Sequence, residues 1–282
     1  MPDKPKRASE YKSEQVEFVR ATCLYVATKL GDMMDDLVIV GGLVPSLIVD
    51  QGALPEDVAA HVGTMDLDVG LQLALLDEGR YRKLTERLRD AGFSMDTNDA
   101  GNPTRQRWAI TGSRTVTVDF LIQPSLAGDK GGKLRDIEPD FAAIIAPGLR
   151  CAFQDRQRVT LEGRTLFNEK ATREIWVCGA GAYVVLKALA FDSRGENKDA
   201  YDLHYVIRNY GSGVDGVVAR LRPLLGDPDV QKALTILQRD FLDPDMVGPS
   251  RVAAFVSGGR DDELQADVVG FVTQLLNKLG ES

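Results

Sequence analysis

The segment TMDLDVGLQL, residues 64–73, sets two aspartates inside a run of alternating apolar residues. Such alternation predicts a strand, on which the side chains of Asp66 and Asp68 share one face while Met65 and Leu67 point into the core. Two like charges this close repel each other, and burial adds a cost in desolvation, unless a cation lies between them. We therefore expect the chain to fold so that a positive group reaches this face of the strand.

A third carboxylate, Asp119, lies among apolar residues on a second predicted strand, VTVDFLIQ, residues 116–123. If the two strands are neighbours, Asp66, Asp68 and Asp119 converge. Oxygen ligands without histidine or cysteine suit a hard ion, which predicts Mg²⁺, or Mn²⁺ in its place, on these three metal ligands. Two such ions about 3.5–4 Å apart can activate an attacking hydroxyl and stabilise a leaving pyrophosphate. The acids thus predict a two-ion catalytic centre.

A pair of glycines supplies the complementary feature. In VIVGGLVPSLIVD, residues 38–50, a buried strand is stopped by Gly41 and Gly42, and a short helix follows with Pro45 in its first turn. Without a Cβ atom in the way, a triphosphate can approach the glycine backbone, and the N–H groups at the start of the helix attract its charge. Alone, the glycines also fit a tight turn and the acids a solvated pair; their order on successive elements favours metal and phosphate binding.

Composition limits the classes of protein that the chain can be. Its 282 residues, 44% of them hydrophobic, can bury one large core or two modest ones. A formal net charge of -8 argues against a nucleic-acid binder that uses its whole surface. Three separated cysteines and two histidines argue against a zinc site or a disulfide framework. No segment has the apolar length of a membrane span or a signal peptide, so we expect a cytoplasmic protein without membrane contact.

Periodicity predicts the remaining elements. A first helix is expected over residues 13–30, capped by Ser13, and a strand hairpin over residues 105–124. The glycine-rich stretch 126–140 is interpreted as a mobile surface loop, and residues 149–181 as short strands, broken at Gly163 and Asn168, that extend the sheet. The chain is then predicted to be helical, over residues 181–194, 197–210, 216–225, 230–241 and 262–280.

One of these helical stretches, VLKALAFDSRGENKDAYDLHYVI, residues 185–207, completes a recognisable set of motifs. Together with VGG, GTMDLDVGL and VDFL it resembles the AbiEii/MenT nucleotidyltransferases of the DNA polymerase beta-like superfamily, which are toxin components of type IV toxin–antitoxin systems. The resemblance implies an α+β (α/β) fold, with a mixed sheet, flanking helices and a mostly helical C-terminal domain. It places the catalytic core in residues 1–128 and a sheet extension with the helical domain in residues 129–282.

The resemblance also implies roles for single residues. Gly41, Gly42 and Thr64 would contact the nucleotide, Lys187 would contact its phosphates, and Asp202 would orient Lys187 or complete the catalytic site. Members of the family transfer a nucleotide from an NTP to an acceptor hydroxyl, in some cases at the 3′ end of tRNA. An antitoxin protein holds them in check, so we expect such a partner here.

The sequence departs from the family pattern in two places, and several residues have ordinary interpretations. The segment between Gly42 and Asp66 is longer than is usual, and His61 stands near the position expected for an arginine. Lys198 and Asp202, four residues apart on one helix, are compatible with a surface ion pair, and Lys198 and Asp199 are interpreted as structural. His204 is expected to pack in the core or at an interface and not to be catalytic, and Trp108 and Trp176 are expected to be core residues and not base-stacking platforms.

Two alternatives to transfer onto RNA stay open. The first is a nucleotidyltransferase for a small-molecule acceptor, as in enzymes that modify antibiotics; the acidic composition favours it, because tRNA binding needs a basic groove. The second is a nucleotide-sensing module on the same fold that has no catalytic activity. The three acids and Lys187 argue against this second alternative.

Overall fold

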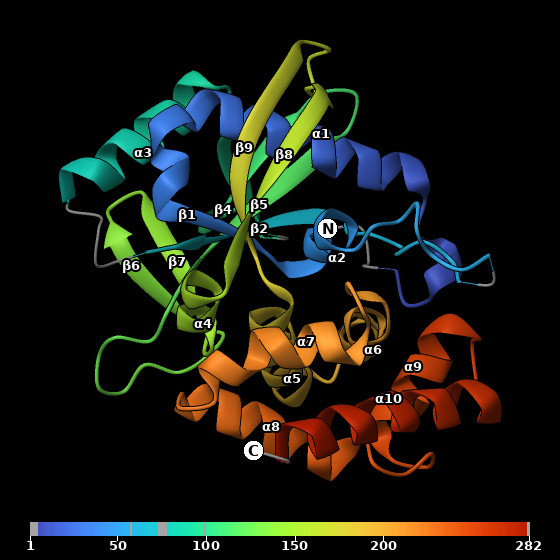
Figure 1. The fold of residues 1–282 in the computed structure, drawn as a ribbon. Helices are drawn as coiled ribbons and strands as arrows, with labels where there is room; N and C mark the ends of the chain where they lie inside the picture. Colours follow the sequence, from blue (N-terminus) through green and yellow to red (C-terminus); the bar gives the residue numbers. More distant parts are fainter. Residues whose placement is uncertain (1–4, 57, 73–77, 99, 281–282) are drawn as a thin grey trace.

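A mixed sheet of nine strands forms the centre of the protein, seen in a computed structural model that describes residues 5–56, 58–72, 78–98 and 100–280 (Figure 1). The strand order is β3-β4-β5-β2-β1-β9-β8, and β7 pairs with both β5 and β6. This architecture confirms the predicted α+β (α/β) class. The strands are β1 (Leu37–Val40), β2 (Asp66–Leu71), β3 (Ser94–Thr97), β4 (Pro103–Thr111), β5 (Thr115–Ile122), β6 (Leu134–Glu138), β7 (Phe141–Ile145), β8 (Arg156–Arg164) and β9 (Lys170–Cys178).

The three strands at the middle of the sheet bring the candidate residues together. β2 runs antiparallel to β1 and parallel to β5, and Asp68 is in register with Val40 on one side and with Asp119 on the other. All four residues of β1 are buried, as expected of a short, continuously apolar strand between two neighbours. Leu67 and Val69 of β2 are also fully buried, so the intervening aspartates occupy the opposite face.

Two helices, α1 (Ser13–Leu30) and α3 (Glu78–Asp90), pack together and lie on one side of the sheet (Figure 1). α1 buries a stripe of apolar residues that includes Val19, Cys23 and Leu30. The prediction that Ser13 caps this helix is wrong. Lys12 holds the N-cap position in an extended conformation and no side chain caps the helix, so Ser13 is its first residue.

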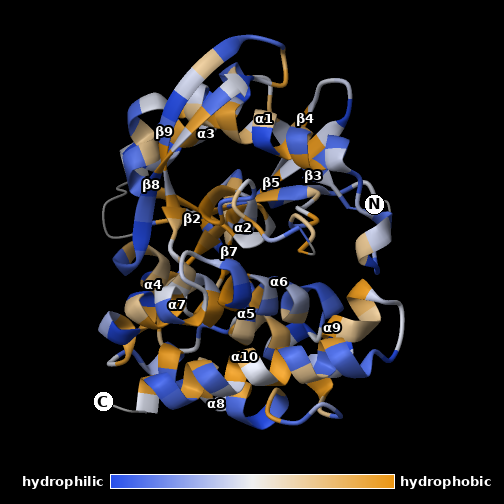
Figure 2. Ribbon diagram, turned by 45° about the vertical axis from the view of Figure 1, so that its right-hand side comes forward, coloured by the Kyte–Doolittle hydropathy of each residue, from blue (hydrophilic) through white to orange (hydrophobic). Residues whose placement is uncertain are grey.

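A bundle of helices lies below the sheet in the view of Figure 1, in which α1 and α3 lie above it. Figure 2 shows apolar residues concentrated between the sheet and these helices. The predicted helical C-terminal part is confirmed, but α9 was missed, although Val252, Ala253 and Phe255 are buried at helical spacing. The helices beyond α1 and α3 are α2 (Val44–Ile48), α4 (Leu149–Gln154), α5 (Ala180–Arg194), α6 (Asn197–Asn209), α7 (Val214–Leu221), α8 (Pro228–Asp240), α9 (Val247–Val256) and α10 (Asp262–Gly280).

The prediction of a loop throughout residues 126–140 is wrong. β6 occupies residues 134–138 and pairs antiparallel with β7, which itself adds to β5. β6 is an edge strand whose burial is low and whose sequence, LRDIE, is largely charged, so it lacks the apolar alternation that identifies a strand. The residues before it are held in part by Asp129, which accepts hydrogen bonds from the backbone of Ser125 and Leu126 and pairs with Arg135.

β8 and β9 form a long antiparallel hairpin in place of the predicted short segments. Asn168 adopts a positive φ of 66° in its turn, which asparagine tolerates better than most residues. β9 pairs in parallel with β1 and leads directly into α5, so the chain beyond residue 129 contributes strands to the same sheet before it forms the bundle. In the described part of the chain, no helix combines the length and apolar character needed to cross a bilayer.

Candidate functional site

The three predicted acids lie on one face of two neighbouring strands. Residues in register on adjacent strands point to the same side of a sheet, so Asp119 of β5 shares the face of Asp68, and Asp66 lies two residues before it. Asp66 and Asp119 are buried, with 9% and 4% of their surface exposed. The hydroxyl of Thr64 donates a hydrogen bond of 2.9 Å to Asp66 Oδ1, which places this predicted nucleotide contact beside the acids.

Asp119 is engaged by a residue that sequence analysis missed. Arg107 lies in register with it on β4 and donates from Nε to Oδ1 at 2.6 Å and from Nη2 to Oδ2 at 2.5 Å. Both side chains are largely buried. The predicted two-residue turn at residues 112–113 would place residue 107 opposite residue 118. The observed loop is one residue longer, since Thr111 pairs with Thr115, and this register places Arg107 opposite Asp119.

A divalent ion at this site would meet the carboxylates of Asp66, Asp68 and Asp119, and both oxygens of Asp119 are held by Arg107. Carboxylate oxygens are the ligands that Mg²⁺ prefers, and the ion usually takes one or two protein carboxylates and completes its shell with water and substrate phosphates. Within residues 5–56, 58–72, 78–98 and 100–280, no three His, Cys, Asp or Glu side chains are grouped so that they could hold one metal ion.

The glycine pair lets side chains approach the turn after β1. Gly41 has a φ of +73°, and a Cβ atom added to it would lie 1.8 Å from Asp68 Oδ2. At Gly42 an added Cβ would lie 2.8 Å from Thr64 Oγ1 and 3.3 Å from Lys198 Nζ. The glycines are therefore required for Asp68 and Thr64 to lie against this turn. α2, which follows, has only five residues, so its dipole adds little positive potential.

A network of buried charges on α5 and α6 faces the glycine turn. Lys187 Nζ lies 2.9 Å from Asp199 Oδ1 and 2.7 Å from Asp202 Oδ2. Lys198 Nζ lies 2.7 Å from Asp202 Oδ1, and Arg194 donates to both oxygens of Asp199, from Nε at 2.6 Å and from Nη2 at 2.8 Å. The predicted pairing of Lys187 with Asp202 is thus present. Three cations share two carboxylates, which leaves one excess positive charge in this network.

Lys198 and Asp202 form the ion pair that their spacing allows, but it is not a surface pair. The side chain of Asp202 is 0% exposed and that of Lys198 is 16% exposed. Burial alone acts to raise the pKa of Asp202, but Lys187 and Lys198 outweigh it and hold that pKa well below its usual range. Burial likewise acts to lower the pKa of Lys187, and Asp202 and Asp199 outweigh it and raise that pKa. These groups are therefore charged at neutral pH.

His61 completes this network from the long segment after α2. Its Nε2 lies 2.9 Å from Asp202 Oδ1, and its Nδ1 accepts a hydrogen bond of 3.0 Å from the backbone N–H of Gly63. An acceptor at Nδ1 places the proton of a neutral ring on Nε2, which then donates to Asp202. Burial lowers the pKa of His61 to about 4, although Asp202 opposes this effect. The residue found where an arginine was expected therefore acts as a neutral hydrogen-bond donor.

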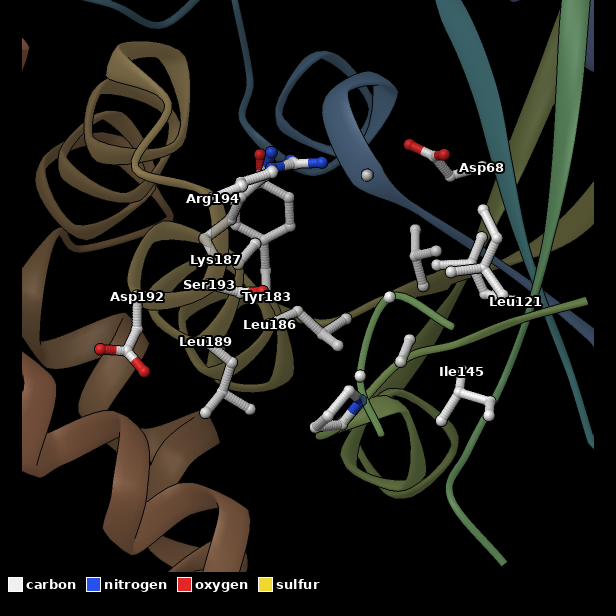
Figure 3. A pocket seen from close by; sticks show the side chains of 18 of the residues that line it. Asp68, Leu121, Ile145, Tyr183, Leu186, Lys187, Leu189, Asp192, Ser193 and Arg194 are labelled. Atoms are coloured by element: carbon white, nitrogen blue, oxygen red, sulfur yellow. The ribbon is translucent and has the colours of Figure 1, made fainter. Parts of the chain in front are cut away.

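A cavity of about 410 Å³ opens between the acid face of the sheet and α5. Figure 3 shows Asp68 on the strand side and Lys187 and Arg194 on the helix side. Hydrogen bonds to Asp199 raise the pKa of Arg194, and the charges of Asp68 and Asp66 act in the same direction. Between these charged walls the lining is mainly apolar, and its larger aliphatic side chains are Val40, Leu121, Ile144, Ile145, Leu186 and Leu189. The cavity thus has Asp68 on its strand side and, across an apolar surface, Lys187, Arg194 and Asp192 on its helix side (Figure 3).

Three residues interpreted as packing residues lie away from this cavity. His204 is buried and its ring packs against Phe271 of α10, and Trp108 is 1% exposed, so both predictions are confirmed. Trp176 packs only partly against the core. The guanidinium groups of Arg156 and Arg158 lie over its ring, at 4.1 and 4.5 Å from the ring centroid. Trp176 is therefore only partly the core residue that was expected.

Comparisons with known proteins do not identify a family or a function for the chain. The family pattern rests on the glycine turn, the acids and the charged residues of α5 and α6, whose positions the structure now gives. What the site can do is therefore inferred from its own charges, distances and shape. Neither the comparison with protein-family models nor the comparison with curated proteins found a match for the chain.

Proposed function

We propose that the protein is a Mg²⁺-dependent nucleotidyltransferase, which transfers a nucleotide from an NTP to an acceptor hydroxyl and releases pyrophosphate. One observation carries the proposal. Asp68 lies against a glycine turn at one wall of a 410 Å³ cavity, and Lys187 and Arg194 lie at the other wall. An NTP carries an anionic tail, a sugar and a flat apolar base, which suit a cavity with charged walls and an apolar lining.

The acids would hold the metal ion. Asp66 and Asp68 present carboxylates from one face of β2, and the hydroxyl of Thr64 supports Asp66 through its hydrogen bond. A bound Mg²⁺ would neutralise charge on the phosphates and lower the pKa of an oxygen that it coordinates. The remaining contribution of the chain is to fix the geometry of the reacting groups, which supplies much of the catalysis in phosphoryl and nucleotidyl transfer.

The buried network would supply positive charge to the triphosphate. Arg194 is the most exposed of its cations, with 56% of its side chain accessible, and it lines the cavity together with Lys187. Lys198 lies next to the glycine turn. Asp199 and Asp202 hold these cations in place, and we therefore assign them positioning roles. Cations that are fixed before the substrate arrives stabilise the transition state with little reorganisation.

The acceptor of our leading proposal is RNA, at the 3′ end of a tRNA, and an antitoxin protein is the proposed partner. A small-molecule acceptor is the second candidate. The net charge of -8 favours it, because a tRNA surface needs phosphate contacts from a basic track. The two candidates share one site and one reaction, so the same assay with two acceptor pools separates them.

Replacing Asp68 with Asn should abolish nucleotide transfer. The change removes one of the two carboxylate charges proposed to hold the ion while keeping the side-chain shape, and we expect a loss of about 10³-fold, equivalent to about 4 kcal/mol in activation free energy. Purified protein, Mg²⁺ and NTPs labelled at the α-phosphate are incubated with total RNA or with a pool of aminoglycosides. Transfer of label to either pool and release of pyrophosphate are then measured.

Asp136→Asn is the matched control. Asp136 is a strand aspartate with 64% of its side chain exposed, and it pairs with Arg105 outside the cavity. We expect this variant to retain the activity of the unmodified protein. Label transfer that survives Asp68→Asn contradicts the metal role of Asp68. NTP binding without transfer to any acceptor favours a nucleotide-sensing module instead.

A further inference from the structure

The pairing of Arg107 with Asp119 bears on how many ions the site takes. The guanidinium contacts the carboxylate through two parallel hydrogen bonds of 2.6 and 2.5 Å, the bidentate geometry in which arginine binds carboxylates best. Their side chains are 16% and 6% exposed. For Asp119 to bind an ion, this pair must break in a largely buried place and leave a guanidinium without its main partner, which is costly.

The charge of Arg107 also acts on the other two acids. Hydrogen bonds from Arg107 to Asp119 are the largest factor that raises the pKa of this guanidinium, and the fields of Asp66 and Asp68 raise it further. Arg107 is therefore close enough to all three carboxylates to be stabilised by each. The guanidinium thus adds a positive charge beside three carboxylates and lowers the need for a second divalent ion there.

We propose that Arg107 stands in the place of a second cation, so that the site binds one divalent ion, on Asp66 and Asp68, and Asp119 is not a metal ligand. This inference rests on the proposed nucleotidyl transfer and revises its expected metal content from two ions to one. Arg107 is then a permanent positive charge beside the reaction centre, supplied by the chain itself. Asp119 is a positioning residue, which fixes the guanidinium next to the metal-binding pair.

The number of bound ions can be measured without activity. The protein is loaded with Mn²⁺ and an equimolar mixture of the four α,β-methylene nucleoside triphosphates, freed of unbound ion by gel filtration, and examined by metal analysis and electron paramagnetic resonance. Two Mn²⁺ ions about 3.5–4 Å apart are magnetically coupled, whereas a single ion gives the spectrum of an isolated centre. We expect one ion per chain and an isolated centre for the unmodified protein.

Arg107→Gln should release Asp119 and open a second site, so that bound Mn²⁺ doubles and the coupled spectrum appears. The double variant Arg107→Gln with Asp119→Asn should return to one ion, because the freed carboxylate is gone. Arg107→Lys keeps the charge and should also stay at one ion. Arg105→Gln is the matched control, since Arg105 lies two residues away on the same strand and pairs with Asp136 instead.

The outcomes separate this inference from the function on which it rests. Two coupled ions in the unmodified protein, or a single ion in a folded Arg107→Gln variant, would overturn the role given to Arg107 and leave nucleotidyl transfer intact. Absence of Mn²⁺ from the unmodified protein would overturn the metal site itself. If Arg107→Gln does not fold, the ion count of the unmodified protein still decides between one and two ions.

Discussion

Asp202→Asn should lower the free energy of unfolding by about 3–5 kcal/mol, the cost of removing one partner from a buried ion pair. Asp202 is fully buried, forms ion pairs with Lys187 and Lys198, and accepts a hydrogen bond from the ring of His61. An asparagine has nearly the same shape but no charge, so Lys198 loses its carboxylate partner and Lys187 keeps only Asp199. The stability of the unmodified protein and the variant is compared by denaturant unfolding.

Asp267→Asn is the matched control for this change. Like Asp202, Asp267 of α10 has a histidine and a basic side chain as partners, His204 Nε2 at 3.5 Å and Arg208 Nη1 at 2.7 Å, but its side chain is 32% exposed. Its partner Arg208 is 31% exposed, so water can solvate the guanidinium that it leaves, and we expect a loss of about 0–1 kcal/mol. If both variants lose the same free energy of unfolding, the buried network does not stabilise the protein more than an exposed ion pair does.

Gly41→Ala should reduce nucleotide transfer by at least about 10²-fold, in the range found when one catalytic contact is removed. Its φ of +73° costs a residue with a Cβ atom about 1–2 kcal/mol. The larger effect is a collision, because the new Cβ would lie 1.8 Å from Asp68 Oδ2. Either the turn or the carboxylate must move, and both are proposed to contact the metal–nucleotide complex. The rate of label transfer in the assay described above measures the effect.

Gly92→Ala separates backbone strain from this collision. Gly92 has a similar φ of +87°, but no atom lies within 4 Å of an added Cβ. We expect it to lose stability by about 1–2 kcal/mol and to keep full activity. If Gly41→Ala and Gly92→Ala transfer nucleotide at the same rate, the approach of Asp68 to the turn is not needed for function.

The sequence predicts those strands whose pattern of apolar residues matches the faces that are buried in the sheet. β1 and its glycine turn, the acid-bearing strand β2 and the β4–β5 hairpin all have the alternation or apolar continuity that their positions in the sheet require. β6 was missed because an exposed edge strand has no apolar face to reveal. Ser13 was predicted to be the N-cap because serine suits that position. In the structure Lys12 is the N-cap, and Ser13 is the first residue of the helix.

The candidate site was predictable only where strand geometry determines it. The shared face of Asp66 and Asp68 follows from their spacing. The pairing of Arg107 with Asp119 does not follow from the predicted turn at residues 112–113, because the observed loop is one residue longer and shifts the register by one. The contact between His61 and Asp202 joins residues 141 positions apart, so local periodicity carries no signal for it. The spacing of Lys198 and Asp202 on one helix predicts an ion pair, but it does not reveal whether that face of the helix is buried.

The location of the nucleotide and its ion tests the central claim most directly. Crystals soaked with Mn²⁺ and the four α,β-methylene nucleoside triphosphates would reveal the ion by anomalous diffraction. We predict a peak in contact with the carboxylates of both Asp66 and Asp68, with the triphosphate between the Gly41 turn and Arg194. A nucleotide bound elsewhere, or an ion that touches neither carboxylate, would contradict the proposed site.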